Sequence, residues 1–315
     1  MKLSNKNLLC ITGPTASGKS AATAAIANRW PIEIINVDSA SIYKDMDIGT
    51  AKPSEEERSL VHHHLLDIRD PSESYSAAQF RTDVIKLVYE IKARGNTPVL
   101  CGGTMLYYKA LKEGLSQLPS ADMAVRQRID EEAKLKGWPA MHKLLESFDP
   151  NAAKRLAPND SQRIQRAIEI YLSTGKTMTQ WIMENPPEPG HDMNLIFLSL
   201  EPKERSELHN RIAHRYRSMI EMGLVEEVKK LYKRGDLNIN MPSIRCVGYR
   251  QIWQHIQGDY NLETAIERAI AATRQLAKRQ LTWLRSYPER NVINCLGDNV
   301  EAKVINFAST FMKNK

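Results

Sequence analysis

The feature that most constrains the fold is a glycine-rich segment, residues 13–20 (GPTASGKS), which matches the pattern G-x-x-x-x-G-K-[ST] at every defined position. Its glycines let the backbone wrap so that consecutive N–H groups converge on phosphate oxygens. The segment lies between an apolar run, residues 7–12, and an alanine-rich stretch, residues 20–28. A strand, a phosphate loop and the positive end of a helix dipole are therefore predicted in succession. We expect Lys19 to contact the outer phosphate and the Ser20 hydroxyl to hold Mg²⁺.

Strand and helix patterns alternate over the first third of the chain, and strand character returns near residue 195. Residues 76–94 have apolar side chains at helical spacing and are followed by Gly95. Such alternation predicts an α/β fold of the P-loop NTPase type, in which helices cover both faces of a parallel sheet. Ligands then bind at the carboxyl ends of the strands, where the polar clusters of this chain fall. The predicted strands are residues 7–12, 32–37, 97–101 and 195–200.

The β pattern disappears after Pro119, and the sequence becomes helical and polar. This segment ends at the breaker-rich residues 185–190 (NPPEPG). We expect an inserted all-helical domain at residues 119–194. Residues 1–118 and 195–315 then form the P-loop catalytic core, which includes a set of C-terminal basic helices.

Composition argues against several classes of protein. No apolar run approaches the roughly 18–20 residues needed to span a bilayer. The short apolar stretch near the N-terminus leads into the phosphate loop without a signal-peptide cleavage site. The four cysteines are scattered with no C-x-x-C pair, which argues against a structural zinc site and a disulfide framework. We expect a cytoplasmic protein without membrane contact.

Two further patterns resemble sites but have simpler interpretations. Residues 174–177 (TGKT) end like a phosphate loop, but Ile170 replaces the first glycine and a helical pattern precedes it, so Gly175 is predicted to end a helix. The histidines at 62–64 are consecutive, and three consecutive side chains of a regular element cannot converge on one ion. No flanking ligand spacing supports a metal, so capping or polar packing is expected.

The chain has a net charge of +7, and the placement of that charge is informative. Residues 268–290 contain six Lys/Arg residues and one acid, Glu289. A helix in this segment gathers its cations within about 140° of one another and leaves an apolar side for the core. Such a basic stripe suits a phosphate backbone, and a solvated face is the alternative. The stripe consists of Arg274, Lys278, Arg279 and Arg285, and the apolar side of Ile270, Leu276, Leu281, Trp283 and Leu284.

The segment after the second predicted strand, residues 38–53, is dense in hydrogen-bonding groups. A long polar loop after a core strand is usually functional. Its first residue, Asp38, could hold Mg²⁺ or act as a base in a P-loop enzyme. The alternative is an ordinary aspartate that caps a turn.

Seven segments resemble the bacterial tRNA dimethylallyltransferases, which are also called tRNA isopentenyltransferases. The resemblance runs from about residue 8 to residue 290 in the family's order, and several of the strings are long and peculiar to that family. The segments are GPTASGKS at 13–20, DSASIYKDMDIGTAKPS at 38–54, HHLLDIRDPSESYSAAQF at 63–80, GGTMLYYKALKEGLSQLPSAD at 102–122, NDSQRIQRAIEIYLSTGKT at 159–177, PSIRCVGYRQ at 242–251 and ATRQLAKRQLTWLR at 272–285.

The resemblance implies transfer of a dimethylallyl group from dimethylallyl diphosphate to the N6 amine of the adenosine immediately 3′ of a tRNA anticodon. No phosphoryl group moves, because the P-loop and Mg²⁺ hold diphosphate as the leaving group. Preorganised N–H groups, Lys19 and the metal suit the negative charge that gathers on diphosphate. The adenine amine must lose a proton as it attacks. By resemblance Asp38 is the base, and Thr104 lies near the amine and the leaving group.

The resemblance also implies the diphosphate-binding residues. An arginine of the helix predicted at residues 203–222 faces the diphosphate, and of Arg211 and Arg215, which share a face, we favour Arg215. A solvated basic face is the alternative, since Arg205 and Arg217 belong to the same run. The expected diphosphate-binding residues are Gly13, Thr15, Ala16, Ser17, Gly18, Lys19, Ser20, Arg211 and Arg215, and the expected catalytic residues are Lys19, Asp38 and Thr104.

The RNA partner implied by the resemblance is the tRNA anticodon stem-loop, whose target base must leave its stack to reach the P-loop. Residues 245–250 combine two cations, a flexible glycine and an aromatic ring, which suits an unstacked base. We expect a monomer, because an enzyme that wraps RNA needs no symmetric partner. The expected tRNA contacts are Asp38, Ser39, Ala40, Ser41, Thr104, Arg126, Gln162, Arg163, Ile164, Gln165, Arg166, Arg245, Cys246, Val247, Gly248, Tyr249, Arg250, Arg274, Lys278, Arg279 and Arg285.

Three other functions share part of this pattern. A phosphotransferase of the nucleotide-kinase type has the same loop but no use for an inserted basic domain. A prenyltransferase that acts on free adenine nucleotides would have little use for Arg163, Arg166 or the basic stripe. A nucleotide-gated RNA-binding protein would not need Asp38 and Thr104 in one cleft.

Overall fold

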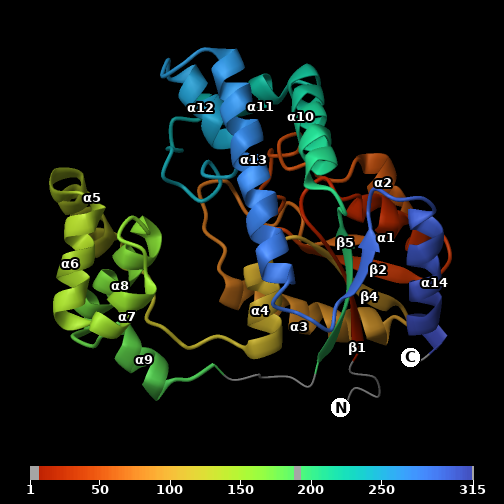
Figure 1. Cartoon of the computed structure of the whole chain (residues 1–315), viewed down its shortest axis with the longest axis horizontal. Helices are drawn as coiled ribbons and strands as arrows, with labels where there is room; N and C mark the ends of the chain where they lie inside the picture. The colour runs from red at the N-terminus through yellow and green to blue at the C-terminus, as the bar shows by residue number, and fades with distance from the viewer. Residues whose placement is uncertain (1–6, 188–192, 314–315) are drawn as a thin grey trace. The chain divides into compact units, whose positions relative to one another are not determined.

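The computed structural model describes residues 7–187 and 193–313. Within these residues six strands form one parallel sheet in the order β3-β2-β4-β1-β5-β6 (Figure 1). The predicted α/β fold is therefore confirmed, although the short edge strands β3 and β6 were not predicted. The strands are β1 (Asn7–Thr12), β2 (Ile32–Val37), β3 (His63–His64), β4 (Thr97–Gly102), β5 (Asn194–Glu201) and β6 (Asn291–Asn294).

Helices connect the strands, and their ends follow local sequence signals. The helix predicted at 76–94 begins with a capping box between Ser76 and Gln79 and gives way to Gly95, which has a positive φ. In the described part of the chain, no helix combines the length and apolar character needed to cross a membrane. The helices are α1 (Lys19–Ala27), α2 (Glu55–Leu60), α3 (Ala77–Ala93), α4 (Met105–Glu113), α10 (Arg205–Glu221), α11 (Leu224–Lys233), α12 (Tyr249–Ile256), α13 (Leu262–Leu284) and α14 (Val300–Lys313).

Each face of the sheet has its own hydrophobic core. Leu8 and Cys10 of β1 point to one face and pack with α3, α4 and the last turns of α13. Leu9 and Ile11 point to the other face and pack with α1 and α14. Because both faces are covered, the central strands are continuous apolar runs rather than alternating ones.

A third core joins the helices α10, α11, α12 and α13. Three side chains of the polar loop after β2, Ile42, Tyr43 and Met46, are buried in this core. The loop is therefore fixed at its middle by hydrophobic burial, while its first residue, Asp38, follows directly from the sheet.

The chain divides into two compact units, Met1–Lys112 with Asp192–Lys315, and Glu113–His191. The described residues of the second unit contain helices and no strand. The predicted inserted domain, residues 119–194, corresponds to this unit with slightly different limits. Its helices are α5 (Met123–Lys136), α6 (Trp138–Phe148), α7 (Pro150–Arg155), α8 (Ser161–Thr174) and α9 (Met178–Glu184).

The helical unit packs around a small core of its own that includes Ile129, Leu145 and Ile168. Helix α8 ends at Gly175, which adopts the left-handed conformation with φ 73°. This confirms that the glycine of the TGKT segment is a helix C-cap, as its sequence context indicated.

Glu33 forms a buried ion-pair network near the amino end of β2, whereas the phosphate loop lies at the carboxyl ends of the strands. Its carboxylate accepts hydrogen bonds from Arg94 Nη2 at 2.7 Å and Asn96 Nδ2 at 2.8 Å, and lies 2.6 Å from His64 Nε2. The His62 and His64 rings lie edge to face with centroids 4.3 Å apart. Polar packing of these histidines was expected. The sequence did not indicate a further metal-ligating side chain beside them, but Glu33 is one. His62 and His64 alternate in an extended segment, so both point to the side on which Glu33 lies. The positively charged Arg94 guanidinium is bound to the Glu33 carboxylate, so its charge would repel a metal cation at this place.

We predict that Glu33→Gln destabilises the fold in a pH-dependent way. The hydrogen bonds from Arg94 lower the pKa of Glu33 from 4.5 to about 2. A depressed carboxylate pKa contributes stability that is complete above about pH 4.5 and is lost as the pH falls toward 2, so the variant should lose about 2–3 kcal/mol at pH 7. Urea unfolding between pH 7 and pH 3 measures the difference in unfolding free energy, which should narrow below pH 4.5.

The matched control for this prediction is Glu90→Gln, which removes only the exposed pair with Lys86 at 3.7 Å. Its effect should stay within about 0.5 kcal/mol at every pH. A constant difference between wild type and the Glu33 variant from pH 5 to pH 3 would contradict the assignment.

Candidate active site

The phosphate loop has the backbone geometry that its glycines predict. A Cβ atom at Gly13, whose φ is +147°, would lie 2.4 Å from the carbonyl oxygen of Leu200 in β5. Gly18 precedes helix α1 in the left-handed conformation, with φ 87°. Only glycine permits both the close approach at residue 13 and this entry into the helix without strain. The loop therefore presents the N-terminus of α1 toward a cavity at the carboxyl edge of the sheet.

The side chains of the loop are held within it. Lys19 Nζ donates to the carbonyl oxygens of Gly13 at 3.1 Å and Pro14 at 2.8 Å. Burial lowers the pKa of Lys19, so an added anion next to the ammonium would favour its charged form. The Ser17 hydroxyl is buried with no hydrogen-bond partner among the described residues, and Ser20 lines the cavity in front of the loop.

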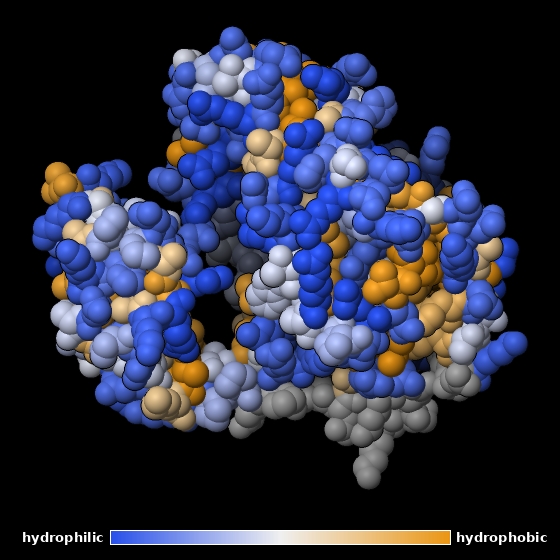
Figure 2. All heavy atoms as spheres, in the orientation of Figure 1, coloured by the Kyte–Doolittle hydropathy of each residue, from blue (hydrophilic) through white to orange (hydrophobic). Residues whose placement is uncertain are grey.

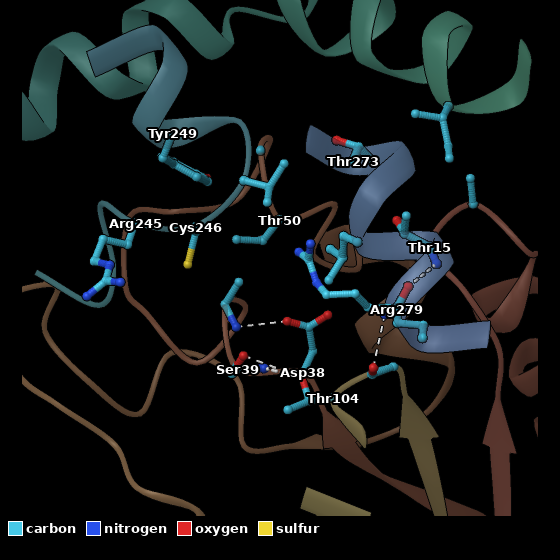
Figure 3. A pocket seen from close by; sticks show the side chains of 18 of the residues that line it. Thr15, Asp38, Ser39, Thr50, Thr104, Arg245, Cys246, Tyr249, Thr273 and Arg279 are labelled. Carbon is cyan, nitrogen blue, oxygen red and sulfur yellow. Dashed lines mark hydrogen bonds between the residues drawn. The ribbon is translucent and has the colours of Figure 1, made fainter. Parts of the chain in front are cut away.

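Asp38 and Thr104 follow two neighbouring strands, as predicted from the sequence. The last residues of β2 and β4, Val37 and Gly102, are paired in the sheet. Asp38 Oδ1 accepts a hydrogen bond from Ala40 N at 2.8 Å, and Ser39 N donates to Thr104 Oγ1 at 3.0 Å. Figure 3 shows Asp38, Ser39 and Thr104 side by side at one wall of the pocket, with Thr15 at another. The two strand ends are thus joined by a short hydrogen bond.

Two cavities meet at these residues. A cavity of about 1230 Å³ lies in front of the phosphate loop and includes Lys19 and Ser20 in its lining. A smaller cavity of about 490 Å³ is lined by Thr104 and by apolar side chains of α4 and α13. Asp38 and Arg215 line both cavities. A molecule with an anionic end and an apolar or aromatic end therefore has complementary surroundings on either side of Asp38.

The structure distinguishes the two arginines of α10. Arg215 is half-buried and lines both cavities, whereas Arg211 is exposed and lines only the larger one. Burial lowers the pKa of Arg215, and the nearby carboxylate of Asp38 partly offsets this effect. Arg215 is thus the one of these two arginines that lines both cavities, and its contact with a diphosphate stays a prediction.

Helix α13 presents most of the predicted basic stripe to solvent. Lys278, Arg279 and Arg285 are exposed, and hydrophilic side chains cover the surface over this helix in Figure 2. Arg274 is half-buried, and its Nε is buried without a partner among the described residues. The apolar side was only partly predicted, because Leu276 and Trp283 line the smaller cavity rather than lying wholly in the core.

The comparisons with known proteins agree with one another. The family described as IPP transferase matches residues 41–287 of the chain. A tRNA dimethylallyltransferase from Bordetella pertussis is 56% identical over 299 residues, which cover 95% of this chain and 96% of that protein. A tRNA dimethylallyltransferase from Burkholderia multivorans is 52% identical over 300 residues, which cover 95% and 92%. The chain belongs to the tRNA dimethylallyltransferase family. It is therefore an enzyme of the prenyl-transferring kind.

Solved structures of this family share the fold. The tRNA isopentenylpyrophosphate transferase from Bacillus halodurans superimposes with a TM-score of 0.70 at 35% identity, covering 98% of this chain and 96% of that one. A eukaryotic dimethylallyltransferase acting on tRNA gives a TM-score of 0.78 at 27% identity, covering 99% of this chain and 80% of that one. The match extends over nearly the whole chain in both cases.

The segment at 245–250 combines a buried aromatic ring with two exposed arginines. The Tyr249 ring is fully buried, and its hydroxyl lies 2.5 Å from Glu227 Oε1. Arg245 and Arg250 are exposed, while Cys246 and Val247 line the smaller cavity. Burial raises the pKa of Cys246 to about 12, so its thiol stays protonated at neutral pH. The tyrosine is therefore held in place by the protein, and it also lines the smaller cavity (Figure 3), so its contact with RNA stays a prediction.

Glu227 of α11 is a residue that the sequence pattern did not identify. Its carboxylate accepts backbone hydrogen bonds from Asp47 at 2.9 Å, Ile48 at 2.8 Å and Gly49 at 3.2 Å. A Cβ at Gly49 would lie 2.5 Å from the Tyr249 ring, so this turn packs directly on the ring. Glu227 thus fixes the far part of the loop that begins at Asp38. With the Tyr249 hydroxyl, four donors contact this one carboxylate, and such a cluster cannot be recognised from the spacing of residues in the sequence.

Two of the expected RNA contacts are largely buried. The Ile164 side chain has no exposed surface and lies in the core of the helical unit, so it is a packing residue. Ser41 is 4% exposed, and its hydroxyl accepts a hydrogen bond from Asn36 Nδ2 at 2.7 Å. Ser41 also lines the larger cavity, and its contact with RNA stays a prediction.

In the helical unit the predicted RNA-contacting arginines surround a buried carboxylate. Glu169, with 1% of its side chain exposed, accepts from Arg126 Nε at 3.0 Å and Arg166 Nη1 at 2.8 Å. Gln165 donates to Asp130 Oδ1 at 2.7 Å, and Arg163 lies 3.2 Å from Asp160. These contacts fix the positions of Arg126 on α5 and of Arg163, Gln165 and Arg166 on α8. Gln162 and Arg163 are exposed on the same helix.

We predict that Gly13→Ala is much more destabilising than Gly95→Ala. Both glycines have positive φ, but a Cβ at Gly95 has open space, whereas one at Gly13 meets Leu200 O at 2.4 Å. Gly95→Ala should cost about 1 kcal/mol of unfolding free energy, and Gly13→Ala at least about 2 kcal/mol, because backbone must move. Urea unfolding of the two variants measures the difference. Equal losses would show that the loop tolerates a side chain at residue 13.

Proposed function

We propose that this enzyme transfers a dimethylallyl group from dimethylallyl diphosphate to the N6 amine of the adenosine immediately 3′ of a tRNA anticodon. The observation that carries the proposal is the position of Asp38, which lines both the phosphate-loop cavity and the smaller cavity. The base is thereby adjacent to the place of the leaving group and to the place of the acceptor. Family membership supports the same chemistry.

The phosphate loop and its neighbours would bind the diphosphate. Consecutive backbone N–H groups at the start of α1, the Lys19 ammonium and the Arg215 guanidinium surround the larger cavity. As the allylic C–O bond breaks, its electron pair passes to diphosphate, so fixed positive groups stabilise the transition state more than the ground state. Arg211, farther out, would contact the outer phosphate.

Mg²⁺ fits the donors present at this place. The Ser20 hydroxyl lies at the first turn of α1 and lines the cavity with Asp38, and hydroxyl, carboxylate and phosphate oxygens are the ligands that Mg²⁺ prefers. When bound, the metal would neutralise part of the charge on the leaving diphosphate.

The acceptor amine needs help to react, because its lone pair is delocalised into the adenine ring. As the N6–carbon bond forms, the proton on N6 passes to the Asp38 carboxylate, which Ala40 N orients through Oδ1. Thr104, hydrogen-bonded to Ser39 N, lies beside this carboxylate. The apolar lining of the smaller cavity, including Met105 and Trp283, suits an isoprenoid or a flipped base.

The exposed cations of α13 and of the helical unit would bind the anticodon stem-loop through its phosphates. We propose a monomeric enzyme, because an enzyme that wraps RNA needs no symmetric partner. A cytoplasmic location follows from the proposed tRNA substrate.

The deciding experiment incubates the protein with Mg²⁺, labelled dimethylallyl diphosphate and unmodified tRNA, with AMP and ATP as competing acceptors. Label in the anticodon-loop adenosine with release of diphosphate is the expected result. Label in AMP or ATP would move the function to free-nucleotide prenylation. Hydrolysis of ATP stimulated by tRNA, with no transfer, would overturn the proposal.

We predict that Asp38→Asn removes turnover and leaves tRNA binding intact. The amide keeps the shape of the side chain but cannot take the proton, so kcat should fall by about 10²-fold to 10⁴-fold. The dissociation constant for tRNA, measured by filter binding, should stay within about threefold. Asp45→Asn, on an exposed residue of the same loop, is the control and should retain activity. Normal turnover of the Asp38 variant would exclude this residue as the base.

We predict that Lys278→Ala weakens tRNA binding uniformly across tRNA sequences. Loss of one phosphate contact should lower the affinity by about fivefold and the slope of log K against log salt by roughly 0.7–0.9. Lys86→Ala, with a side chain 76% exposed on α3, is the control for loss of a positive charge. A change equal to that of the control would show that the stripe is only a solvated face.

A further inference from the structure

Gln280 is the polar residue of α13 that faces inward. Only 9% of its surface is exposed, although its neighbour Arg279 is exposed on the basic stripe. Its Oε1 accepts a hydrogen bond from Thr15 N at 2.9 Å, and its Nε2 donates to Gly103 O at 2.9 Å. One side chain thus joins the phosphate loop to the turn that follows β4.

The orientation of this amide is fixed by its partners. A backbone N–H such as that of Thr15 can only donate, and a carbonyl oxygen such as that of Gly103 can only accept. A carboxylate would keep the first bond but place an acceptor against the Gly103 carbonyl, and a thioether would make neither bond. Among side chains of this length, glutamine alone satisfies both groups.

The turn after β4 is shaped around this contact. A Cβ atom at Gly103 would lie 2.4 Å from Gln280 Nε2, so a glycine is required for the approach. The next residue, Thr104, donates its backbone N–H to Val37 O at 3.0 Å and accepts from Ser39 N at 3.0 Å. A chain of short contacts therefore runs from Gln280 through the Gly103 turn to the loop that carries Asp38.

The second hydrogen bond of Gln280 joins it to Thr15, in a part of the phosphate loop that the sheet does not fix. Thr15 lies three residues beyond the end of β1, and its N–H is directed to Gln280 rather than to the cavity. Gln280 also lines both cavities. Its two bonds set the distance between the phosphate loop and the Thr104 turn.

We propose that Gln280 is a positioning residue that holds the diphosphate loop and the Asp38–Thr104 pair in register, so that diphosphate can leave the allylic carbon while the base reaches the proton on the attacking N6 amine. This inference rests on the function proposed above. The helix that carries the basic stripe therefore also fixes the geometry of the two halves of the site. Reacting groups need placement to within a fraction of an ångström, and small displacements cost large factors in rate.

The test compares Gln280→Met and Gln280→Glu with the uncharged changes Gln275→Met and Gln275→Asn, at an exposed residue of the same helix. Steady-state kinetics with saturating tRNA measure kcat and KM for dimethylallyl diphosphate. Isothermal titration with inorganic diphosphate and Mg²⁺ measures binding without turnover. Thermal unfolding and tRNA filter binding show whether the fold and the stripe are intact.

The expected result is a fall in kcat of about tenfold or more for Gln280→Met, because two hydrogen bonds of the site are lost. Diphosphate binding should weaken by severalfold, and Gln280→Glu should be worse than Gln280→Met because of the opposed acceptors. Binding of tRNA and the Gln275 variants should stay near wild type. A lower melting temperature with unchanged kcat and unchanged diphosphate affinity would overturn the positioning role.

The two proposals fail separately. If the wild-type protein does not transfer the prenyl group, the proposed function fails, and the diphosphate titration still tests whether Gln280 holds the phosphate loop. If the wild type is active and the Gln280 variants match it in kcat and in diphosphate affinity, the positioning role alone is wrong.

Discussion

The parallel register of the central strands is the constraint on which the site depends. Ile11 of β1 pairs with Cys101 of β4, and Val37 of β2 pairs with Gly102. The phosphate loop, Asp38 and Thr104 therefore begin at one edge, although they are far apart in sequence. A slip of one residue would turn each buried side chain to the opposite face, so the two hydrophobic cores that fix the register also fix the geometry of the site.

Electrostatic compensation explains how the site holds its charges. Burial lowers the pKa of both Lys19 and Arg215, and for both the Asp38 carboxylate acts in the opposite direction. Two cations beside one anion leave a surplus of positive charge in a partly desolvated cavity. An anionic ligand with more than one charge would offset this surplus. The same arrangement keeps a carboxylate next to the cations, where the proposed mechanism requires a proton acceptor.

Sequence patterns predicted those parts of the molecule that repeat or that obey backbone rules. The phosphate loop, the apolar strands and the Gly175 cap follow from glycine geometry and periodicity. The same reasoning did not identify Gln280 as a buried polar residue, and it did not indicate that the Tyr249 ring is buried. Burial of a polar side chain depends on partners that are distant in sequence, and spacing within one helix contains no information about them.

Gln280 and Glu227, the two residues that periodicity missed, serve a common physical purpose. A sheet fixes the residue that directly follows each strand, but Thr15 and the turn at residues 47–49 lie farther out, where no strand partner satisfies their N–H groups. Gln280 from α13 and Glu227 from α11 accept those hydrogen bonds from outside the sheet. An unsatisfied buried N–H group costs about 1–3 kcal/mol, so these side chains make one loop conformation preferable to its alternatives. The helical layer α10–α13 is therefore needed for the site itself, and not only to cover the sheet.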